Sequence, residues 1–304
     1  MDAPEADVEV DAELVARLVA AQHPAFLGPV RPAASGWDNV IMRIGERWAA
    51  RMPRRGLADR LVRSEQRWLR EVAGSLPDGV AAPVPVAAGA PGAGYPYAWS
   101  ITPWFDGGAA ASVDPAERRA IAEPLADVLV ALGRPAPAEA PANPFRGVPL
   151  SYRDDVLSER LSSGRLERVV PTDAAALAAV WRDALAAPPW AGAARWVHGD
   201  PHPGNLLVDG DAADGLRLVA LLDFGDLTAG DPATDLAAAW LVFDPPGRAR
   251  FRARVEALRP TDAGDWARAR GWALAMGSAI VDTVGVGGPI GRVGAHALAQ
   301  VLLD

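Results

Sequence analysis

The spacing of apolar residues predicts a small β-rich region at the N-terminal end of this chain. Apolar side chains in residues 8–22 recur at helical intervals, which predicts a short amphipathic helix. Residues 38–53 favour two strands that meet around Gly45 and Glu46, and residues 57–72 return to helical spacing. The pattern therefore places a strand pair between two helices.

The pattern changes after residue 76, where proline, alanine and glycine dominate up to residue 96. That composition indicates an irregular segment on a surface, and residues 98–105, AWSITPWF, follow it as a short apolar strand. Farther along, alanine-rich helical patterns prevail and are interrupted by an expected loop at residues 134–147. We therefore expect a connector near residues 100–108 between a β-rich part and a helical part.

A β-hairpin is expected inside the helical part. Residues 206–208 and 216–223 are apolar, and the sequence DGDAADG between them is typical of a turn. After Asp235 the chain is predicted to be helical almost to its end. The predicted class is α+β, with a small β-rich N-terminal lobe and a larger, mainly helical C-terminal lobe.

Composition narrows the classes of protein that fit. With 304 residues, half of them apolar, the chain can bury the core of one large domain or of two smaller ones. No apolar stretch is long enough to span a bilayer, and the acidic N-terminus differs from a secretory signal, so we expect a cytoplasmic protein without a membrane partner. The net charge of −8 argues against nucleic acid as a partner.

Two residue types are missing, and both absences limit the chemistry. The sequence holds no cysteine, which excludes disulfides and thiolate metal sites. It also holds no lysine, because all 30 of its lysine-plus-arginine residues are arginine. Any function that needs a permanent side-chain cation must therefore use arginine.

The segment WVHGDPHPGNLLVD, residues 196–209, carries the residues that point most clearly to chemistry. Asp200 precedes Asn205 with four residues between them, and Asp223 begins the tripeptide Asp-Phe-Gly after the expected hairpin. This is the spacing of a protein-kinase catalytic loop and its metal-binding segment. In that arrangement Asp200 accepts the proton of the attacking hydroxyl, while Asn205 and Asp223 supply the oxygen ligands that Mg²⁺ prefers.

The two histidines of this segment leave a second interpretation open. His198 is expected to support the loop by hydrogen-bonding to backbone near Asp200 or Asp223, whereas the pattern gives His202 no single role. A zinc site with both histidines as ligands is the rival interpretation, although oxygen donors outnumber imidazoles here. The prolines and the glycine of the loop favour rigidity, which suits a residue that must be held in position.

The sequences HGDPHPGNLLVD and ALLDFGDLTAGDPATDLA together resemble the aminoglycoside phosphotransferase and choline kinase family of small-molecule kinases. That family's signature is a His-Gly-Asp-x-His-x-x-Asn loop, an Asp-Φ-Gly/Glu metal segment and a Gly-Asp-Pro-x-x-Asp-Leu sequence, and all three occur here in that order. The resemblance extends over nearly the whole chain, with looser motifs in its N-terminal half. It implies a bilobed protein-kinase-like fold, ATP or GTP as the phosphate donor, and a small hydroxylated acceptor.

A kinase needs a cation on the donor phosphates, and the N-terminal half offers Arg51. Glu65 lies in an otherwise apolar helical stripe, where a charge is costly unless it is paired. Arg51 on the preceding strand is its expected partner and takes the place of the usual lysine. Residues 35–45 are expected to lie over the phosphates, and backbone near Ser100 to Thr102 is expected to hydrogen-bond to the nucleotide base.

Two aspartates downstream are expected to support the site. Asp231 precedes Pro232 in the manner of a helix cap, and Asp235 follows one turn later, where it can accept a hydrogen bond from the catalytic loop. The tryptophans are expected in the core, with an acceptor-pocket wall as the alternative for Trp240, Trp266 and Trp272. Candidate acids for binding the ammonium groups of an acceptor are Asp226, Asp244 and Asp282.

The first hypothesis is a Mg²⁺-dependent O-phosphotransferase that moves the γ-phosphate of ATP or GTP to a hydroxyl of a small molecule. The acceptor expected first is an aminoglycoside-like antibiotic, which is cationic and would imply resistance; a macrolide, sugar, choline or homoserine type of compound is the alternative. A nucleotide-binding pseudokinase without turnover is the second hypothesis, because the usual lysine is missing. Residues 1–103 are expected to bind the nucleotide, and residues 104–304 to hold the catalytic loop, the metal site and the acceptor pocket, in a monomer or homodimer.

Overall fold

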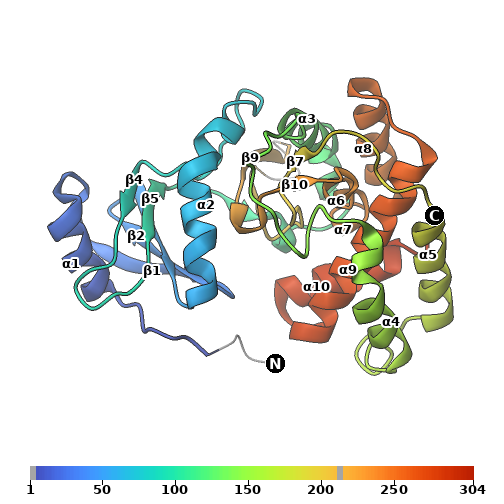
Figure 1. The fold of residues 1–304 in the computed structure, drawn as a ribbon, viewed down its shortest axis with the longest axis horizontal. Coiled ribbons are helices and arrows are strands. Elements are labelled where there is room, and N and C mark those ends of the chain that lie inside the picture. The colour runs from blue at the N-terminus through green and yellow to red at the C-terminus, as the bar shows by residue number, and fades with distance from the viewer. Residues whose placement is uncertain (1–4, 211–214) are drawn as a thin grey trace.

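The computed structural model describes residues 5–210 and 215–304, which divide into two parts (Figure 1). The N-terminal part is a β-sheet with helix α1 (Ala12–Gln22) on its outer side and helix α2 (Gly56–Ala73) between the sheet and the rest of the molecule. The C-terminal part is larger and mainly helical. The predicted α+β class is therefore confirmed.

Five antiparallel strands form the N-terminal sheet, in the order β1-β2-β3-β5-β4. The predicted strand pair is β2 and β3, which are joined through Gly45, a glycine with a φ of 55°. Strand β3 also pairs with β5, so that Arg51 lies opposite Ser100. The strands are β1 (Val30–Ser35), β2 (Asn39–Ile44), β3 (Trp48–Pro53), β4 (Ala87–Gly89) and β5 (Trp99–Pro103).

Helices α1 and α2 fix the sheet on its two sides. Asp11 caps α1 by accepting a hydrogen bond from the backbone N–H of Leu14 at 2.7 Å, and the apolar side of α1 packs against the sheet. Helix α2 carries the buried Glu65, whereas its Leu69 and Val72 belong to the apolar core of the C-terminal part. Because α2 packs in this way, it joins the two parts and carries Glu65 close to the boundary between them.

The C-terminal part surrounds two small sheets with helices. Strand β8 lies between β6 and β9, and β7 pairs with β10. These strands are β6 (Gly108–Ala109), β7 (Arg195–Val197), β8 (Leu206–Asp209), β9 (Arg217–Leu221) and β10 (Thr228–Gly230). The α-helices are α3 (Ala122–Leu132), α4 (Asp154–Ser162), α5 (Ala174–Ala186), α6 (Ala233–Leu236), α7 (Ala238–Leu241), α8 (Pro245–Leu258), α9 (Ala263–Val284) and α10 (Gly288–Gln300). Short 3₁₀ turns are η1 (Pro24–Phe26), η2 (Ala110–Ser112), η3 (Glu117–Ile121), η4 (Leu150–Arg153) and η5 (Phe224–Asp226).

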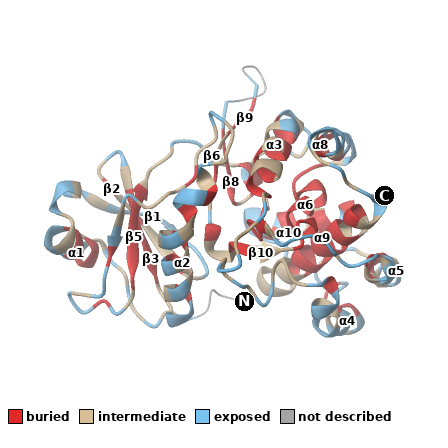
Figure 2. Ribbon diagram, turned by 45° about the horizontal axis from the view of Figure 1, so that its top comes forward, coloured by how far each residue is buried: buried red, intermediate tan, exposed pale blue. Residues whose placement is uncertain are grey.

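Helices α6 and α9 lie among the buried residues at the centre of the C-terminal part (Figure 2), and the residues of α7 belong to the same core. Trp240, Trp266 and Trp272 lie in this core, with at most 6% of each residue exposed. The alternative that these tryptophans line an acceptor pocket is therefore wrong. Burial of such large apolar side chains is a main source of stability for this part.

The expected hairpin is present as the antiparallel pair β8 and β9. The turn expected over DGDAADG lies in part outside the described residues, which leave out 211–214. Two strands of the N-terminal sheet, β1 and β4, were not predicted from the sequence. Across the described residues, no helix combines the length and the apolar character needed to cross a membrane.

Candidate active site

A cleft of about 670 Å³ lies between the two parts of the molecule. The N-terminal part contributes Arg51 and the β1–β2 turn around Trp37 to its walls. The C-terminal part contributes Asp200 and Asn205 from one loop and Asp223 from the segment that follows strand β9. The cleft therefore gathers the three residues singled out by the kinase-like spacing, together with the arginine expected beside them.

Residues 198–205 form an irregular loop between β7 and β8 whose shape is fixed from within. The N–H of His202 donates to the carbonyl of Asp200, and the N–H of Asn205 donates to the carbonyl of His202, each at 2.9 Å. Gly199 has a φ of 92°, and a Cβ there would lie 2.7 Å from the carbonyl oxygen of Asp226. Only glycine fits this position without a clash. The backbone conformation of Gly199 therefore helps to set the direction of the Asp200 side chain that follows it.

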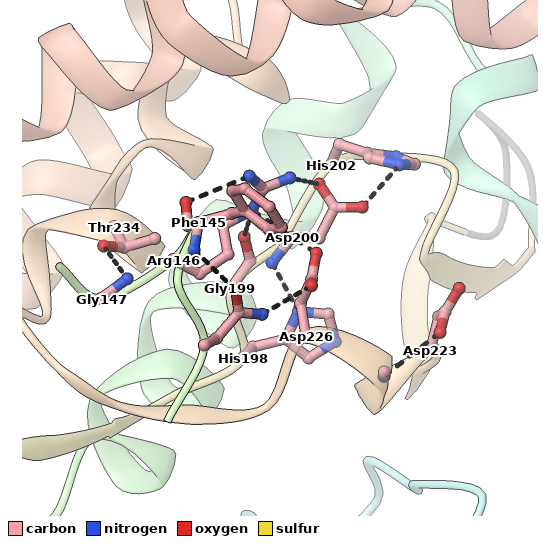
Figure 3. A network of polar contacts seen from close by, with 12 residues as sticks. Phe145, Arg146, Gly147, His198, Gly199, Asp200, His202, Asp223, Asp226 and Thr234 are labelled. Carbon is pink, nitrogen blue, oxygen red and sulfur yellow. Dashed lines mark hydrogen bonds and ion pairs between the residues drawn. The ribbon is translucent and has the colours of Figure 1, made fainter. Parts of the chain in front are cut away.

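The two carboxylate oxygens of Asp200 have different surroundings (Figure 3). Oδ2 accepts a hydrogen bond from Asn205 Nδ2 at 3.3 Å and lies 3.4 Å from His202 Nε2. Oδ1 lies 4.0 Å from Arg146 Nη2 and accepts no hydrogen bond from the residues that the structure describes. Oδ1 is therefore the oxygen left to accept a proton from a ligand in the cleft.

His202 orients this carboxylate. Its Nδ1 accepts the backbone N–H of Gly204 at 2.9 Å, so the ring hydrogen lies on Nε2, which faces Asp200. Burial alone would raise the pKa of Asp200, but the neighbouring His202 and Arg146 hold that pKa well below its usual range. In turn Asp200 raises the pKa of His202, against the effect of burial. Asp200 is therefore an ionised acceptor at neutral pH.

Asn205 and Asp223 lie at the same cleft and retain unused oxygens. The amide nitrogen of Asn205 donates to the carbonyl of Asp200 at 2.9 Å, which leaves its Oδ1 without a hydrogen-bond partner among the described residues. Asp223 Oδ1 accepts from Arg51 and from the N–H of Gly225, whereas Asp223 Oδ2 has no partner in the same set of residues. These free oxygens are the donors that Mg²⁺ prefers, so the residues fit such an ion.

The backbone of Asp223 is strained. Its φ of 57° is one of two positive φ values at non-glycine residues in the described chain. Such conformations cost about 1–3 kcal/mol and persist where the surrounding structure enforces them, often at functional sites. The side chain of Asp223 is about half exposed, so the strain presents its carboxylate to the cleft.

Arg51 forms ion pairs with an acid from each part of the molecule, Glu65 of the N-terminal part and Asp223 of the C-terminal part. One guanidinium nitrogen, Nη2, lies 2.9 Å from Glu65 Oε1 and 2.8 Å from Asp223 Oδ1. Burial would lower the pKa of Arg51, but these two carboxylates raise it above its ordinary value. The structure thus places Glu65 beside Arg51, and Arg51 itself lines the cleft.

His198 and Asp235 lie behind the loop. Nε2 of His198 hydrogen-bonds to the carbonyl of Leu222 at 2.9 Å, and its Nδ1 accepts the N–H of Asp200 at 3.2 Å. Asp235 accepts the backbone N–H groups of His198 and Gly199 at 2.7 and 2.9 Å. Both ring nitrogens of His198 are therefore engaged by backbone, which argues against the zinc interpretation, since a ligating histidine needs a free nitrogen.

Asp231 lies one step farther from the cleft. It accepts the N–H of Ala233 at 2.9 Å and forms a buried ion pair with Arg268 at 2.8 Å. Arg268 also pairs with Asp265 at 2.7 Å, so Asp231 ties the segment after Asp223 to helix α9. This position supports the site without reaching the cleft.

Replacing Asp235 with alanine is expected to lower the free energy of unfolding by about 2–4 kcal/mol. The change leaves the buried N–H groups of His198 and Gly199 without acceptors, and each such group costs about 1–3 kcal/mol. Urea unfolding followed by tryptophan fluorescence measures the change, with Asp183→Ala on the exposed side of α5 as the control. Equal stability of Asp235→Ala and the wild type would contradict this role.

The structure separates the two residues expected near the nucleotide base. Thr102 lines the cleft, whereas Ser100 is fully buried and its side chain accepts a hydrogen bond from Gln66 at 3.1 Å. The reason is that Ser100 lies inside the sheet, where β5 pairs with both β3 and β4. In this segment the residues that line the cleft are Thr102 to Phe105 and Gly107, so the connector begins later than expected.

The sequence interpretation missed Arg146, which lies in the segment expected to be a plain loop. Arg146 Nε donates to the carbonyl of Gly199 at 2.7 Å and lies 3.5 Å from Asp226 Oδ2 (Figure 3). Asn143 from the same segment donates to Asp226 at 2.8 Å. No periodicity marks these residues, because irregular segments carry none.

Comparison with known proteins identifies similar sequences and structures. A model of the "Phosphotransferase enzyme family" matches residues 29–272, and no curated protein matches the chain in sequence. The GDP complex of wild-type aminoglycoside 2'-phosphotransferase-IIIa is 15% identical, with a TM-score of 0.64 over 97% of this chain and 99% of that chain. The apoenzyme of macrolide 2'-phosphotransferase MphH from Brachybacterium faecium is 18% identical, with a TM-score of 0.59 over 95% and 97%.

A third similar structure is the streptomycin–ATP ternary complex of APH(2")-IIa. It is 19% identical and has a TM-score of 0.54 over 90% of each chain. At identities this low the likeness shows the fold and leaves the substrate open. The bilobed kinase-like fold predicted from the sequence is thereby confirmed.

Proposed function

We propose that this chain, which belongs to the phosphotransferase enzyme family and so transfers phosphate to an alcohol group, uses a magnesium-bound nucleoside triphosphate as donor and a small hydroxylated molecule as acceptor. The observation that supports this proposal most strongly is the different environment of the two Asp200 oxygens. Oδ2 is held by Asn205 and His202, whereas Oδ1 is open to a ligand in the cleft. A carboxylate presented in this way suits a general base.

In the proposed reaction Asp200 orients the acceptor hydroxyl and takes its proton on Oδ1. The hydroxyl oxygen forms a bond to the γ-phosphorus, and the bond from that phosphorus to the β,γ-bridging oxygen breaks. The products are the phosphorylated acceptor and a nucleoside diphosphate. Most of the rate enhancement would come from positioning and electrostatics, as is usual for phosphoryl transfer.

The metal-binding role is assigned to Asn205 and Asp223 on the basis of their unused oxygens. Magnesium held there would offset negative charge on the donor phosphates. Arg51, positioned by Glu65, would grip the same phosphates through its remaining nitrogens. The turn around Gly36 and Trp37 would cover them, and backbone from Thr102 to Phe105 would contact the base of ATP or GTP.

The division of the chain into lobes is part of this proposal. Residues 1–103 would supply nucleotide binding, and residues 104–304 the catalytic loop, the metal site and the acceptor pocket. The donor is a cytoplasmic metabolite, so we assign the reaction to the cytoplasm. Neither nucleic acid nor membrane is proposed as a partner, and a monomer or homodimer would suffice because all the assigned residues come from one chain.

Replacing Arg51 with alanine is expected to weaken nucleotide binding by about tenfold or more, because one charge-assisted contact to phosphate is worth about 1.5–3 kcal/mol. Titration with a fluorescent nucleotide in the presence of Mg²⁺ measures this change. Since Arg51→Ala also leaves the buried Glu65 unpaired, Arg51→Lys tests the charge without that defect and should recover part of the affinity. Arg17→Ala on the exposed side of α1 is the control, and full affinity in a folded Arg51→Ala protein would remove the assigned role.

The acceptor is first sought among antibiotics. An aminoglycoside-like compound is the acceptor that the family resemblance favours, and resistance would then be the cellular role. A macrolide, sugar, choline or homoserine type of compound is the alternative. Release of nucleoside diphosphate across a panel of these compounds tests the proposal: release that depends on one class supports an enzyme, and nucleotide binding without any release supports a pseudokinase.

A further inference from the structure

Apolar and positively charged side chains lie next to Arg146 and next to the catalytic loop, at the edge of the cleft. Arg146 Nη2 is 4.0 Å from Asp200 Oδ1, and the guanidinium carbon of Arg153 lies 5.4 Å from the centre of the Phe145 ring. Ile290, at the start of α10, contacts the loop at Gly204, where an added Cβ would lie 2.6 Å from Ile290 Cδ1. We call these four residues, Phe145, Arg146, Arg153 and Ile290, the acceptor wall; Arg146 lines the cleft itself, and the other three lie outside its lining.

The apolar members of the acceptor wall remain accessible. Phe145 is 52% exposed and Ile290 is 37% exposed. Both are close to the catalytic loop, one through Arg146 and the other through Gly204. The apolar part of an acceptor whose hydroxyl lies at Asp200 would contact these two side chains.

The acids expected to bind ammonium groups are already neutralised. Asp226 accepts from Asn143 and lies 3.5 Å from Arg146. Asp282 is held between two arginines, Arg160 at 3.1 Å and Arg165 at 3.0 Å. The third acid, Asp244, forms a two-oxygen ion pair with Arg119 and caps helix α8. An acceptor with several ammonium groups would have to displace these arginines.

Arg153, unlike these acids, has no partner of opposite charge within ion-pair distance among the described residues. Its side chain is partly buried and has neither a hydrogen bond nor a carboxylate within 4.0 Å among the residues that the structure describes. Burial, together with the nearby charges of Arg146 and Arg160, lowers the pKa of Arg153. Removing a cation partly from water without a nearby opposite charge costs free energy. A bound anion beside Arg153 would lower that cost.

We propose that the acceptor is a hydroxylated molecule with an apolar body and a carboxylate or phosphate group, and that Arg153 binds this anionic group. This inference rests on the proposed function, because it concerns the same site, and it replaces the aminoglycoside-like acceptor, which the resemblance favours, with an anionic one. Arg146, balanced by Asp200 and Asp226, stays beside the reacting hydroxyl, while Phe145 and Ile290 contact the apolar body. Guanidinium is suited to carboxylate and phosphate through paired hydrogen bonds.

Three matched alcohols test the charge preference: 4-(hydroxymethyl)benzoate, 4-methylbenzyl alcohol and 4-(aminomethyl)benzyl alcohol. They share a hydroxyl and an aromatic ring and differ in charge at the far end. Binding to the protein saturated with Mg²⁺ and ADP is followed by calorimetry. The carboxylate is expected to bind at least about tenfold more tightly than the amine, as for one charge-assisted hydrogen bond.

Variants of Arg153 decide whether this residue is responsible. Arg153→Ala should remove most of the preference, Arg153→Lys should keep part of it, and Arg153→Glu should reverse it in favour of the amine. Arg182→Ala on the exposed side of α5 should leave it unchanged. The inference is overturned if the amine binds more tightly to the wild type, if the preference survives Arg153→Ala, or if none of the three alcohols binds.

Failure of this inference is distinguishable from failure of the proposed function. Nucleotide binding that depends on Mg²⁺ and on Asp223 tests the reaction without any acceptor. If that binding is intact and the amine is preferred, only the assignment of Arg153 is lost. If that binding is absent, the proposed reaction is lost, whatever the charge preference.

Discussion

Replacing Asp200 with asparagine is expected to lower kcat by about 100-fold to 10,000-fold while nucleotide affinity stays within a few fold. Asparagine fills the same volume, and its oxygen can still face Asn205 and His202. Its amide nitrogen would then take the place of Oδ1, where a donor cannot accept the proton of a hydroxyl. Release of nucleoside diphosphate with the best acceptor measures kcat, and titration with nucleotide measures affinity.

The matched control for this change is Asp78→Asn, at an exposed loop position that does not line the cleft. It should leave both quantities unchanged. A parallel urea titration separates lost chemistry from lost folding. Turnover by Asp200→Asn within a few fold of the wild type would show that another group accepts the proton.

Replacing Asp223 with alanine is expected to abolish the magnesium dependence of nucleotide binding. Removing a residue that hydrogen-bonds to a metal ligand lowers metal affinity roughly 10-fold to 100-fold. Removing a direct ligand should lower it further. Affinity for ATP with Mg²⁺, compared with affinity in the presence of a chelator, measures this effect directly. Turnover should fall with it, because the donor phosphates lose their counter-charge.

Two controls separate the metal role of Asp223 from its ion pair with Arg51. Asp209→Ala removes an exposed aspartate from the neighbouring hairpin and should change nothing. Arg51→Ala removes the other half of the ion pair and should weaken binding while keeping its magnesium dependence. A magnesium dependence that persists in Asp223→Ala would refute the ligand assignment.

The fold was predictable where apolar spacing is regular. Strands β2 and β3 and helix α2 follow that spacing, and the helix predicted over residues 8–22 is present as α1, although it begins at Ala12, after its cap Asp11. Strand β1 was not predicted, because it is an exposed edge strand without alternating apolar and polar residues. It also contains Pro32, a residue found in sheets mainly in edge strands. Strand β4 escaped because three residues carry too little pattern.

The site was predictable where its geometry is local in sequence. The spacing of Asp200, Asn205 and Asp223 reflects one loop and one hairpin, which bring the three residues to one cleft. Arg146 was not predictable, because it reaches Gly199 across 53 residues from a segment without periodicity. Ser100 shows the reverse error: the strand was predicted, but sequence alone could not tell which of its residues is enclosed between two neighbouring strands.

The arginine at the phosphate end of the cleft has a practical consequence for anyone profiling this protein. Nucleotide probes that acylate the phosphate-site amine of kinases find no amine at Arg51, and the chain has no other side-chain amine to offer. A labelling experiment with such reagents would therefore not detect this protein, even when it is active. Dicarbonyl reagents, which modify guanidinium groups, would be needed to label it, and bound nucleotide would slow that labelling.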